Sequence, residues 1–270
     1  MHPLPKPAAW RDADWHLTDD TQLTLATCEA VTQEEPDPAV IAGSLLRWFR
    51  ARRLTGLGAS TLKALRDLNA GAHWALAGRQ GEHAAGNGAA MRIAPLAFCV
   101  DPCTRDGRRL IRDVCRITHQ NDEAYAGALA VVLAIRGATE LSTPISLDRV
   151  AADLPDSSVR DRLAIYAGLP PQVSLADAAM RYGTSGYVVE SVPFALFAAW
   201  RLNELGFAEM LNQVIIVGGD TDTNASLACQ ISGAALGLVG LPADLLQRLP
   251  QAELIFDVVR HFAANVARSD

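Results

Sequence analysis

The sequence predicts an all-α fold, organised as a single compact domain of many helices. Apolar residues recur at helical spacing along most of the chain, and half of the 270 residues are hydrophobic, which is enough for a sizeable core. Strand-like alternation is almost absent, and neither an internal repeat nor a low-complexity linker interrupts the pattern. We therefore expect one domain over residues 15–270, preceded at residues 1–14 by a polar lead-in without a core of its own.

Individual helices are predicted from caps and amphipathic spacing. Asp37 and Pro38 form a cap followed by a first-turn proline, after which apolar residues recur on one helical face. Ser60 is expected to cap the next amphipathic segment, and the alanine-rich stretch 122–136 is expected to stop at Gly137. Further helices are expected around an apolar face at 110–115 and at residues 146–153, 157–167, 174–182, 190–205, 224–239 and 250–268.

Charge and composition exclude several classes of function. The formal net charge of −6 gives no support for a nucleic-acid partner. The five cysteines show no paired metal-binding spacing, and their odd number, without a signal peptide, favours a reducing cytosol. Apolar stretches fall short of the roughly 20 residues that a membrane span requires. We expect a cytoplasmic protein with no membrane partner.

Two acidic phrases near opposite ends of the chain raise the question of function. TDDT at 18–21 opens one helical segment, and DTDT at 220–223 follows the apolar run VIIV at 214–217. That run is the only one that looks like a strand, and it is too short to distinguish a strand from a buried helical turn. Asp220 and Asp222 would not share a helix face, so we expect them in an irregular turn before a helix that begins near Asn224.

The residues alone leave two interpretations of these phrases open. Asp and Thr cap helices in many proteins, so each phrase could be a helix start without further function. Two such phrases, each followed by a helix of small residues, favour a shared cation site instead. Ligand sets made only of oxygen select hard cations such as Mg²⁺, Mn²⁺ or Ca²⁺.

Two other metal motifs fit the second phrase poorly. An EF-hand loop starting at Asp220 would need glycine at its sixth position and glutamate at its twelfth, where this chain has Ala225 and Ile231. An apolar run followed by D-x-D also resembles the nucleophile motif of haloacid-dehalogenase-type phosphatases. That fold needs a long α/β domain after the motif, whereas only 48 residues, 223–270, follow Asp222. The phosphatase remains a weak alternative.

A series of motifs resembles one known family, the ADP-ribosylglycohydrolases. The family includes dinitrogenase-reductase-activating glycohydrolase and the ADP-ribosyl-arginine hydrolases. The resemblance covers roughly residues 15–260, and the ordered set of motifs makes it far more specific than GGDTDT alone. Its motifs are TDDTQLTLA at 18–26, GLGASTLKALRDLNAGAHW at 56–74, GNGAAMRIAPLA at 86–97, THQNDEAYAGA at 118–128, GYVVESVPFAL at 186–196 and VGGDTDTNAS at 217–226.

The resemblance implies an all-α fold with two divalent cations, Mg²⁺ or Mn²⁺, in a cleft that receives ADP-ribose. It implies a hydrolase that removes ADP-ribose from a modified protein or small molecule, with ADP-ribosyl-arginine as one expected substrate. The glycosidic bond could be to nitrogen or to oxygen. The four aspartates would act in catalysis through the metals, and the implied metal ligands are Thr18, Asp19, Asp20, Asp220, Asp222 and Thr223.

The resemblance also assigns six residues to ligand binding: Gly86, Asn87, Gly88, His119, Gly186 and Tyr187. The two glycines around Asn87 allow close backbone approach, and the histidine could donate to a phosphate or ribose oxygen. The tyrosine offers a stacking face and a hydroxyl. The alternatives are a turn before a helix, a structural histidine and core packing. Arg92 and Glu190 receive no chemical role and are interpreted as an ion pair.

One departure from the family pattern concerns the start of the chain. Family members usually begin with a glycine-rich helix, followed by a glutamate that reaches the metal site. Residues 1–17 contain no glutamate, and Asp12 and Asp14 are their only acids. If that glutamate is a general acid or base, we expect a loss of roughly 10²–10⁴-fold in rate. Three explanations stay open: the sequence lacks an upstream segment, another acid takes the role of the glutamate, or the protein binds ADP-ribose without efficient hydrolysis. The alternative function is accordingly a non-catalytic ADP-ribose binder or structural relative of the same fold.

Overall fold

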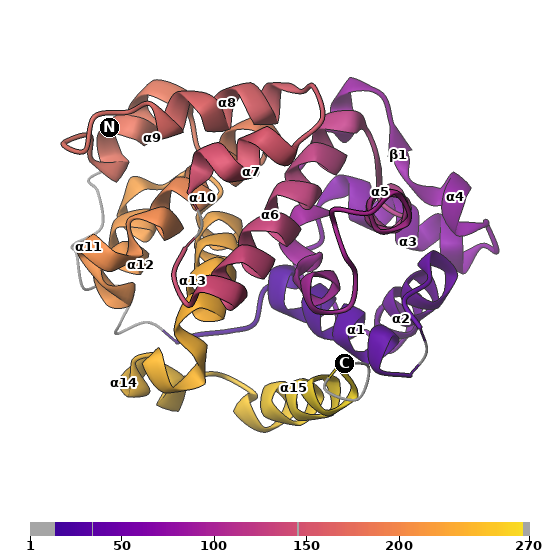
Figure 1. The fold of residues 1–270 in the computed structure, drawn as a ribbon. Helices are drawn as coiled ribbons and strands as arrows, with labels where there is room; N and C mark the ends of the chain where they lie inside the picture. The colour runs from indigo at the N-terminus through magenta and orange to yellow at the C-terminus, as the bar shows by residue number, and fades with distance from the viewer. Residues whose placement is uncertain (1–13, 34, 145, 267–270) are drawn as a thin grey trace.

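The computed structural model describes residues 14–33, 35–144 and 146–266, and this part of the chain is almost entirely helical (Figure 1). The predicted all-α class is confirmed. The predicted boundary between residues 14 and 15 remains a prediction, since residues 1–13 lie outside the described part. The α-helices are α1 (Asp19–Gln33), α2 (Pro38–Arg50), α3 (Ala59–Asn69), α4 (Trp74–Ala77), α5 (Arg105–Arg116), α6 (Asp122–Leu141), α7 (Leu147–Asp153), α8 (Ser158–Ala167), α9 (Leu175–Tyr182), α10 (Val188–Trp200), α11 (Leu202–Leu205), α12 (Phe207–Val217), α13 (Thr221–Gly240), α14 (Ala243–Gln247) and α15 (Ala252–Val266).

Several helix ends differ from the predicted ones. Helix α3 begins one residue before Ser60, which is buried inside the first turn, and the cap position belongs to Gly58. Helix α6 continues through a buried Gly137 to Leu141. Tertiary packing on a buried face outweighs the weak helix-breaking tendency of one glycine.

The apolar run VIIV proves to be helical. It forms the last turn of α12, which the sequence did not predict as a helix. Met210 and Val214 of this helix are completely buried. The phosphatase alternative needs a strand at VIIV, but this run is helical. In the described residues the only sheet is the two-stranded one formed by β1 and β2, so this alternative is wrong.

Helix α6 forms the centre of the molecule. Figure 1 shows it running between α5, α7, α8, α10 and α13, all of which contact it. Among the described residues, α6 alone is long and apolar enough to cross a membrane by length and composition, and 78% of its apolar window is buried inside the protein. Core helices pass the same test, so this helix is weak evidence for a membrane span.

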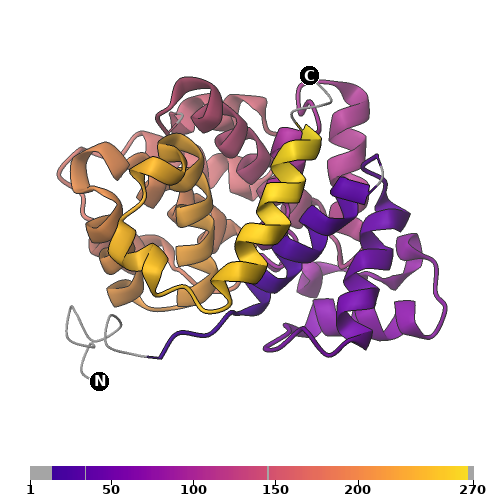
Figure 2. The same ribbon diagram turned by 90° about the horizontal axis from the view of Figure 1, so that it is seen from below.

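Two contacts bring the ends of the chain together. Helix α15 packs along α1, as Figure 2 shows, and the N-terminal part of α1 also contacts α13. The residue Asn265 donates to the carbonyl oxygen of Val31 at 3.0 Å. The two acidic phrases, at the starts of α1 and α13, are therefore held in one region.

A short parallel ladder lies beside this region. Strands β1 (Arg79–Gln80) and β2 (His119–Gln120) pair in register, with Arg79 opposite His119. Further along the chain, Gly86 bridges to Tyr187. The ladder and the bridge connect the loop after β1 to the segment before α10. They also fix His119 on the side of the acidic residues.

Candidate metal centre

The first half of the acidic cluster is the N-terminus of α1. The carbonyl oxygen of Thr18 accepts from the N–H of Gln22 at 3.2 Å, and the Thr18 hydroxyl donates to Oδ2 of Asp20 at 3.0 Å. Asp19 and Asp20 are the first two helical residues and are almost completely buried. Unpaired N–H groups at a helix start favour nearby negative charge, which helps to hold two carboxylates there.

The second half is the N-terminus of α13. The helix begins at Thr221, earlier than the predicted start near Asn224. Asp220 therefore occupies the cap position, and Asp222 lies within the first turn, not in an irregular turn before the helix. The predicted helix start was three residues late, because the chain completes its turn at Gly218 and Gly219 and the helix already includes Asp222.

That reversal depends on two glycines and one threonine. Gly218 and Gly219 have φ values of 80° and 83°, which residues with a side chain rarely adopt. A Cβ atom at Gly219 would also collide with Thr184. The carbonyl oxygen of Thr184 accepts from the backbone N–H of Asp220 and from Nδ2 of Asn224, both at 2.8 Å. These bonds fix the direction in which the second acidic phrase points.

The two halves meet in space. Asp19, Asp20 and Asp222 each offer a carboxylate oxygen, and these atoms lie within 4.8 Å of one another. Asp220 lies beside them, and its Oδ2 accepts from Nδ2 of Asn87 at 2.7 Å. Residues from opposite ends of the sequence thus form one cluster of four carboxyl groups.

Proximity and burial perturb these acids. The pKa of Asp20 is raised to about 7, chiefly by burial and to a smaller extent by the nearby carboxylate of Asp222. Burial likewise raises the pKa of Asp19 to about 6, with smaller contributions from Asp222 and Asp220. The pKa of Asp220 is also raised, chiefly by burial, although the hydrogen bond from Asn87 opposes the change. The cluster is an unfavourable place for negative charge unless a cation is present.

The residues present fit a hard divalent cation. Oδ1 of Asp20 is buried and has no hydrogen-bond partner among the described residues, so it is a free acceptor aimed inward. The side chain of Thr223 opposes the rise in pKa of both Asp20 and Asp220, which fits a position near both carboxyl groups. Carboxylate and hydroxyl oxygens without His or Cys are the ligands that Mg²⁺ and Mn²⁺ prefer.

A cavity of about 280 Å³ adjoins the acids. Its lining includes Asp19 and Asp220 together with the segment Gly86–Gly88, His119 and Gly186. The volume is at the lower end of the range of small-molecule pockets, roughly 300–1,000 Å³. The cavity therefore suits one sugar ring and its neighbouring groups.

The glycines of this cavity permit close approach. A Cβ atom at Gly88 would lie 2.8 Å from Cε1 of His119, and one at Gly186 would lie 3.1 Å from Oδ2 of Asp220. The backbone N–H of Asn87 donates to the carbonyl oxygen of Gly186 at 3.1 Å. Glycine is required at these positions because larger residues would displace the side chains that face the ligand.

The ring of His119 has a defined protonation state. Nη2 of Arg92 donates to Oγ1 of Thr118 at 2.9 Å, and Oγ1 lies 2.8 Å from Nδ1 of His119. Thr118 is fully buried, and within the described residues Nδ1 is the acceptor available to its hydroxyl proton. We infer that this hydroxyl donates to Nδ1, which leaves the ring hydrogen on Nε2. Burial lowers the pKa of His119 to about 3, with help from Arg92 and Arg79, so the ring is neutral.

Two expected contacts are not found in the structure. The ring of Tyr187 is 43% exposed and does not line the cavity, so its contact with a ligand remains a prediction. The expected ion pair is wrong: Arg92 is fully buried and donates to Val114 and Thr118, whereas Glu190 accepts from Ser185.

The lining also includes residues to which the sequence had assigned no role: Gly56, Gly58, Ala59, Ser60, Thr61 and Met91. The signal available for most of them was the pair of glycines in GLGAST. Gly56 has a φ of 75°, and its ideal Cβ position lies 3.8 Å from Oδ1 of Asp19.

The chain is similar to several known proteins. The family model described as ADP-ribosylglycohydrolase matches residues 3–270. An ADP-ribosylarginine hydrolase Tri1 of Pseudomonas putida is 30% identical over 91% of this chain and 66% of its own length. The mouse ADP-ribosylhydrolase ARH3 is 26% identical over 89% of this chain and 75% of its own. A solved chain titled ADP-ribosylglycohydrolase-related protein complex is 27% identical, with a TM-score of 0.65 over 93% of this chain and 82% of that one.

Proposed function

The chain belongs to the ADP-ribosylglycohydrolase family, and from this membership we propose that it is a divalent-cation-dependent hydrolase that releases ADP-ribose from a modified acceptor. Membership by itself supports an ADP-ribosyl hydrolase. The metal dependence is our inference from the cluster of Asp19, Asp20, Asp220 and Asp222 beside a cavity of ribose size. This juxtaposition is the observation on which the proposal depends.

The six oxygen-bearing residues are the proposed metal ligands: Thr18, Asp19, Asp20, Asp220, Asp222 and Thr223. Cations held there, two Mg²⁺ or Mn²⁺ ions by the family pattern, would supply the positive charge that binds sugar hydroxyls and activates water. The buried, unpartnered Oδ1 of Asp20 supports this assignment. The raised pKa values of Asp19 and Asp20 support it as well.

The chain's own groups would bind and orient the ligand. Asn87 is anchored to Asp220 by its Nδ2 and to Gly186 by its backbone N–H, so it holds the glycine-rich segment against the acids. Nε2–H of His119 is a neutral donor at the cavity wall, suited to a phosphate or ribose oxygen. Orientation by such fixed groups lowers the barrier because the reacting atoms are already positioned.

The proposed partner is ADP-ribose attached to a protein or small molecule. The relative named as an ADP-ribosylarginine hydrolase makes arginine-linked ADP-ribose the first substrate to test, and serine-linked ADP-ribose is the O-glycosidic comparison. All five cysteines are free thiols, which supports the further proposal of a reducing, cytoplasmic location.

The decisive experiment measures release of ADP-ribose from arginine-linked and serine-linked substrates with Mg²⁺, with Mn²⁺ and after EDTA. We expect release with at least one cation and none after EDTA. Binding of ADP-ribose without release under every condition would overturn the hydrolase and favour a non-catalytic binder. Release that is unchanged by EDTA would contradict the metal assignment and leave the hydrolase in place.

A further inference from the structure

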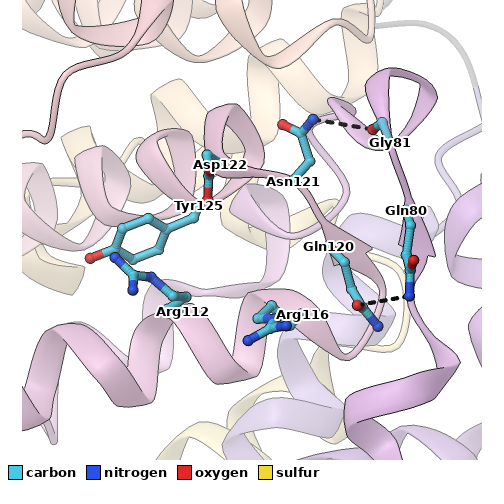
Figure 3. Close-up of a pocket in the computed structure, with 8 residues that line it drawn as sticks. All are labelled: Gln80, Gly81, Arg112, Arg116, Gln120, Asn121, Asp122 and Tyr125. Atoms are coloured by element: carbon cyan, nitrogen blue, oxygen red, sulfur yellow. Dashed lines mark hydrogen bonds between the residues drawn. The ribbon is translucent and has the colours of Figure 1, made fainter.

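A second hollow lies on the other side of the β1–β2 ladder (Figure 3). Its volume is about 650 Å³, larger than the cavity at the acids, and none of the four clustered aspartates lines it. Successive side chains of a strand point to opposite faces. Accordingly, His119 lines the cavity at the acids, whereas its neighbour Gln120 lines this second hollow.

One wall of the hollow is basic. Five of the twelve residues of α5 are arginine, and Arg112 and Arg116, one turn apart, both line the hollow. Within the described residues neither guanidinium forms an ion pair, whereas Arg109 on the same helix pairs with Asp113 at 3.8 Å.

Arg112 is held in place by an aromatic ring. Its guanidinium carbon lies 4.6 Å from the centre of the Tyr125 ring, which is almost fully buried. Figure 3 shows the two side chains together at one end of the hollow, with Arg116 one turn further along the helix. Stacking leaves the edge of the guanidinium, with its N–H donors, directed to the solvent side.

The opposite wall consists of amides. Nε2 of Gln80 donates to Oε1 of Gln120, and Nδ2 of Asn121 donates to the carbonyl oxygen of Gly81, both at 3.2 Å. Asn121 also caps α6, whose N-terminus faces the hollow through Asp122. The lining therefore carries two positive charges against the single negative charge of Asp122.

We propose that this hollow is a binding site for a small phosphate-bearing molecule, with its phosphate held between Arg112 and Arg116. Guanidinium groups bind phosphate through paired N–H donors, and a helix N-terminus adds favourable charge. The amides of Gln80 and Asn121 lie where they can contact the remainder of the molecule. The volume accommodates a mononucleotide as well as free phosphate.

The test is a titration of the metal-free, EDTA-treated protein with inorganic phosphate, AMP and adenosine, followed by nuclear magnetic resonance. We expect saturable shifts of the side-chain amide signals of Gln80, Gln120 and Asn121 with phosphate and AMP, at a dissociation constant of about 1 mM or tighter. Adenosine should cause no shift at these amides. Tighter binding of AMP than of phosphate would identify an organic phosphate as the natural ligand, and equal binding would identify the free anion.

Matched variants separate this site from general charge effects. Arg112→Gln and Arg116→Gln should each weaken phosphate binding about tenfold. Arg109→Gln, on the same helix outside the lining, should leave it unchanged. Asp122→Asn should strengthen binding, because it removes the one negative charge of the lining.

Three results would overturn the proposal. The first is that phosphate and AMP cause no saturable shift of the Gln80, Gln120 and Asn121 side-chain amide signals. The second is that the shifts are confined to the Gly86–Gly88 amides of the other cavity. The third is that the shifts persist unchanged in both arginine variants. Because the titration uses no cation and measures no catalysis, its result is independent of the proposed hydrolase.

Discussion

The two hollows on either side of the β1–β2 ladder are built in opposite ways. At the acidic cavity, Asp19 and Asp20 are buried beside like charges, and their pKa values rise to about 6 and about 7. At the basic hollow, Arg112 and Arg116 are exposed and remain hydrated. The smaller cavity thus contains buried charges, whereas the arginines of the larger hollow are exposed. Electrostatic perturbation, rather than volume, marks the candidate catalytic centre.

The largest effect is expected from neutralising a buried acid of the cluster. Asp20→Asn should reduce ADP-ribose release by at least about 10³-fold, because several kcal/mol of charge stabilisation would depend on the bound cations. The same change should raise the stability of the metal-free protein, since it removes a buried charge from a cluster of like charges. Kinetics and thermal unfolding of one preparation measure both effects.

Asp153→Asn is the matched control, because Asp153 is an exposed aspartate at the end of α7. It should change neither activity nor stability appreciably. A loss of activity in Asp20→Asn accompanied by lower metal-free stability would contradict the account of the cluster as a site of repulsion.

The second prediction concerns pH. The pKa values of Asp19 and Asp20 lie above the ordinary value of 3.8, so between about pH 4 and pH 7 the folded protein binds more protons than the unfolded chain. In EDTA, the free energy of unfolding should therefore be fully retained near pH 4 and fall as the pH rises through about 7. Thermal unfolding at a series of pH values measures this slope.

Addition of Mg²⁺ or Mn²⁺ should reverse the trend, because a cation binds the ionised carboxylates of the folded state. At a free concentration 100-fold above the dissociation constant, the stabilisation should be about 2.7 kcal/mol. A metal-free protein whose stability increases from pH 4 to pH 7 would show that other groups outweigh the cluster.

The third prediction tests the cavity wall. Gly88→Ala would place a Cβ atom 2.8 Å from Cε1 of His119 and should weaken ADP-ribose binding about tenfold by displacing the ring. Gly233→Ala in α13 is the control, since a Cβ atom there meets nothing within 4 Å. Calorimetric titration with ADP-ribose compares the two. Equal affinities would mean that His119 does not contact the ligand.

The smallest effect is expected from the hydrogen bond behind that ring. Thr118→Val removes the donor to Nδ1 of His119 and should weaken ADP-ribose binding about fivefold, the worth of about one hydrogen bond. Thr118→Ser keeps the donor and should retain the affinity. Imidazole nitrogen shifts provide the direct readout: Nε2 should be protonated in the parent and in Thr118→Ser, and both tautomers should appear in Thr118→Val.

The sequence predicted much of the architecture because most helices carry their own signals. Asp37 caps α2 as expected, and its carboxylate accepts from the N–H of Ala39 at 2.7 Å. Helix α12 was missed because its apolar run is short, and helical and buried-strand patterns coincide over four residues. Gly137 was misjudged because its burial in α6 depends on neighbours from other parts of the chain.

The acidic cluster could be suspected from composition, yet its convergence could not be derived from spacing. From the sequence, TDDT and DTDT could each be a simple helix cap as well as half of a cation site. Only the packing of α1 against α13 brings them together. The roles of Arg92 and Thr118 were similarly hidden. A buried arginine that bonds a neighbouring threonine leaves no pattern in the residues around it.

The packing of α1 against α13 and α15 also has a consequence for how the protein folds. The two halves of the acidic cluster come from segments separated by nearly the whole chain, so their meeting closes a very long loop. Closing a loop of this length has an entropic cost, so contacts of this range slow folding relative to contacts within local helices. A nascent chain that ends before Asp222 lacks one half of the acidic cluster. The proposed cations would therefore bind only after this long-range contact has formed, and they would then stabilise the folded state.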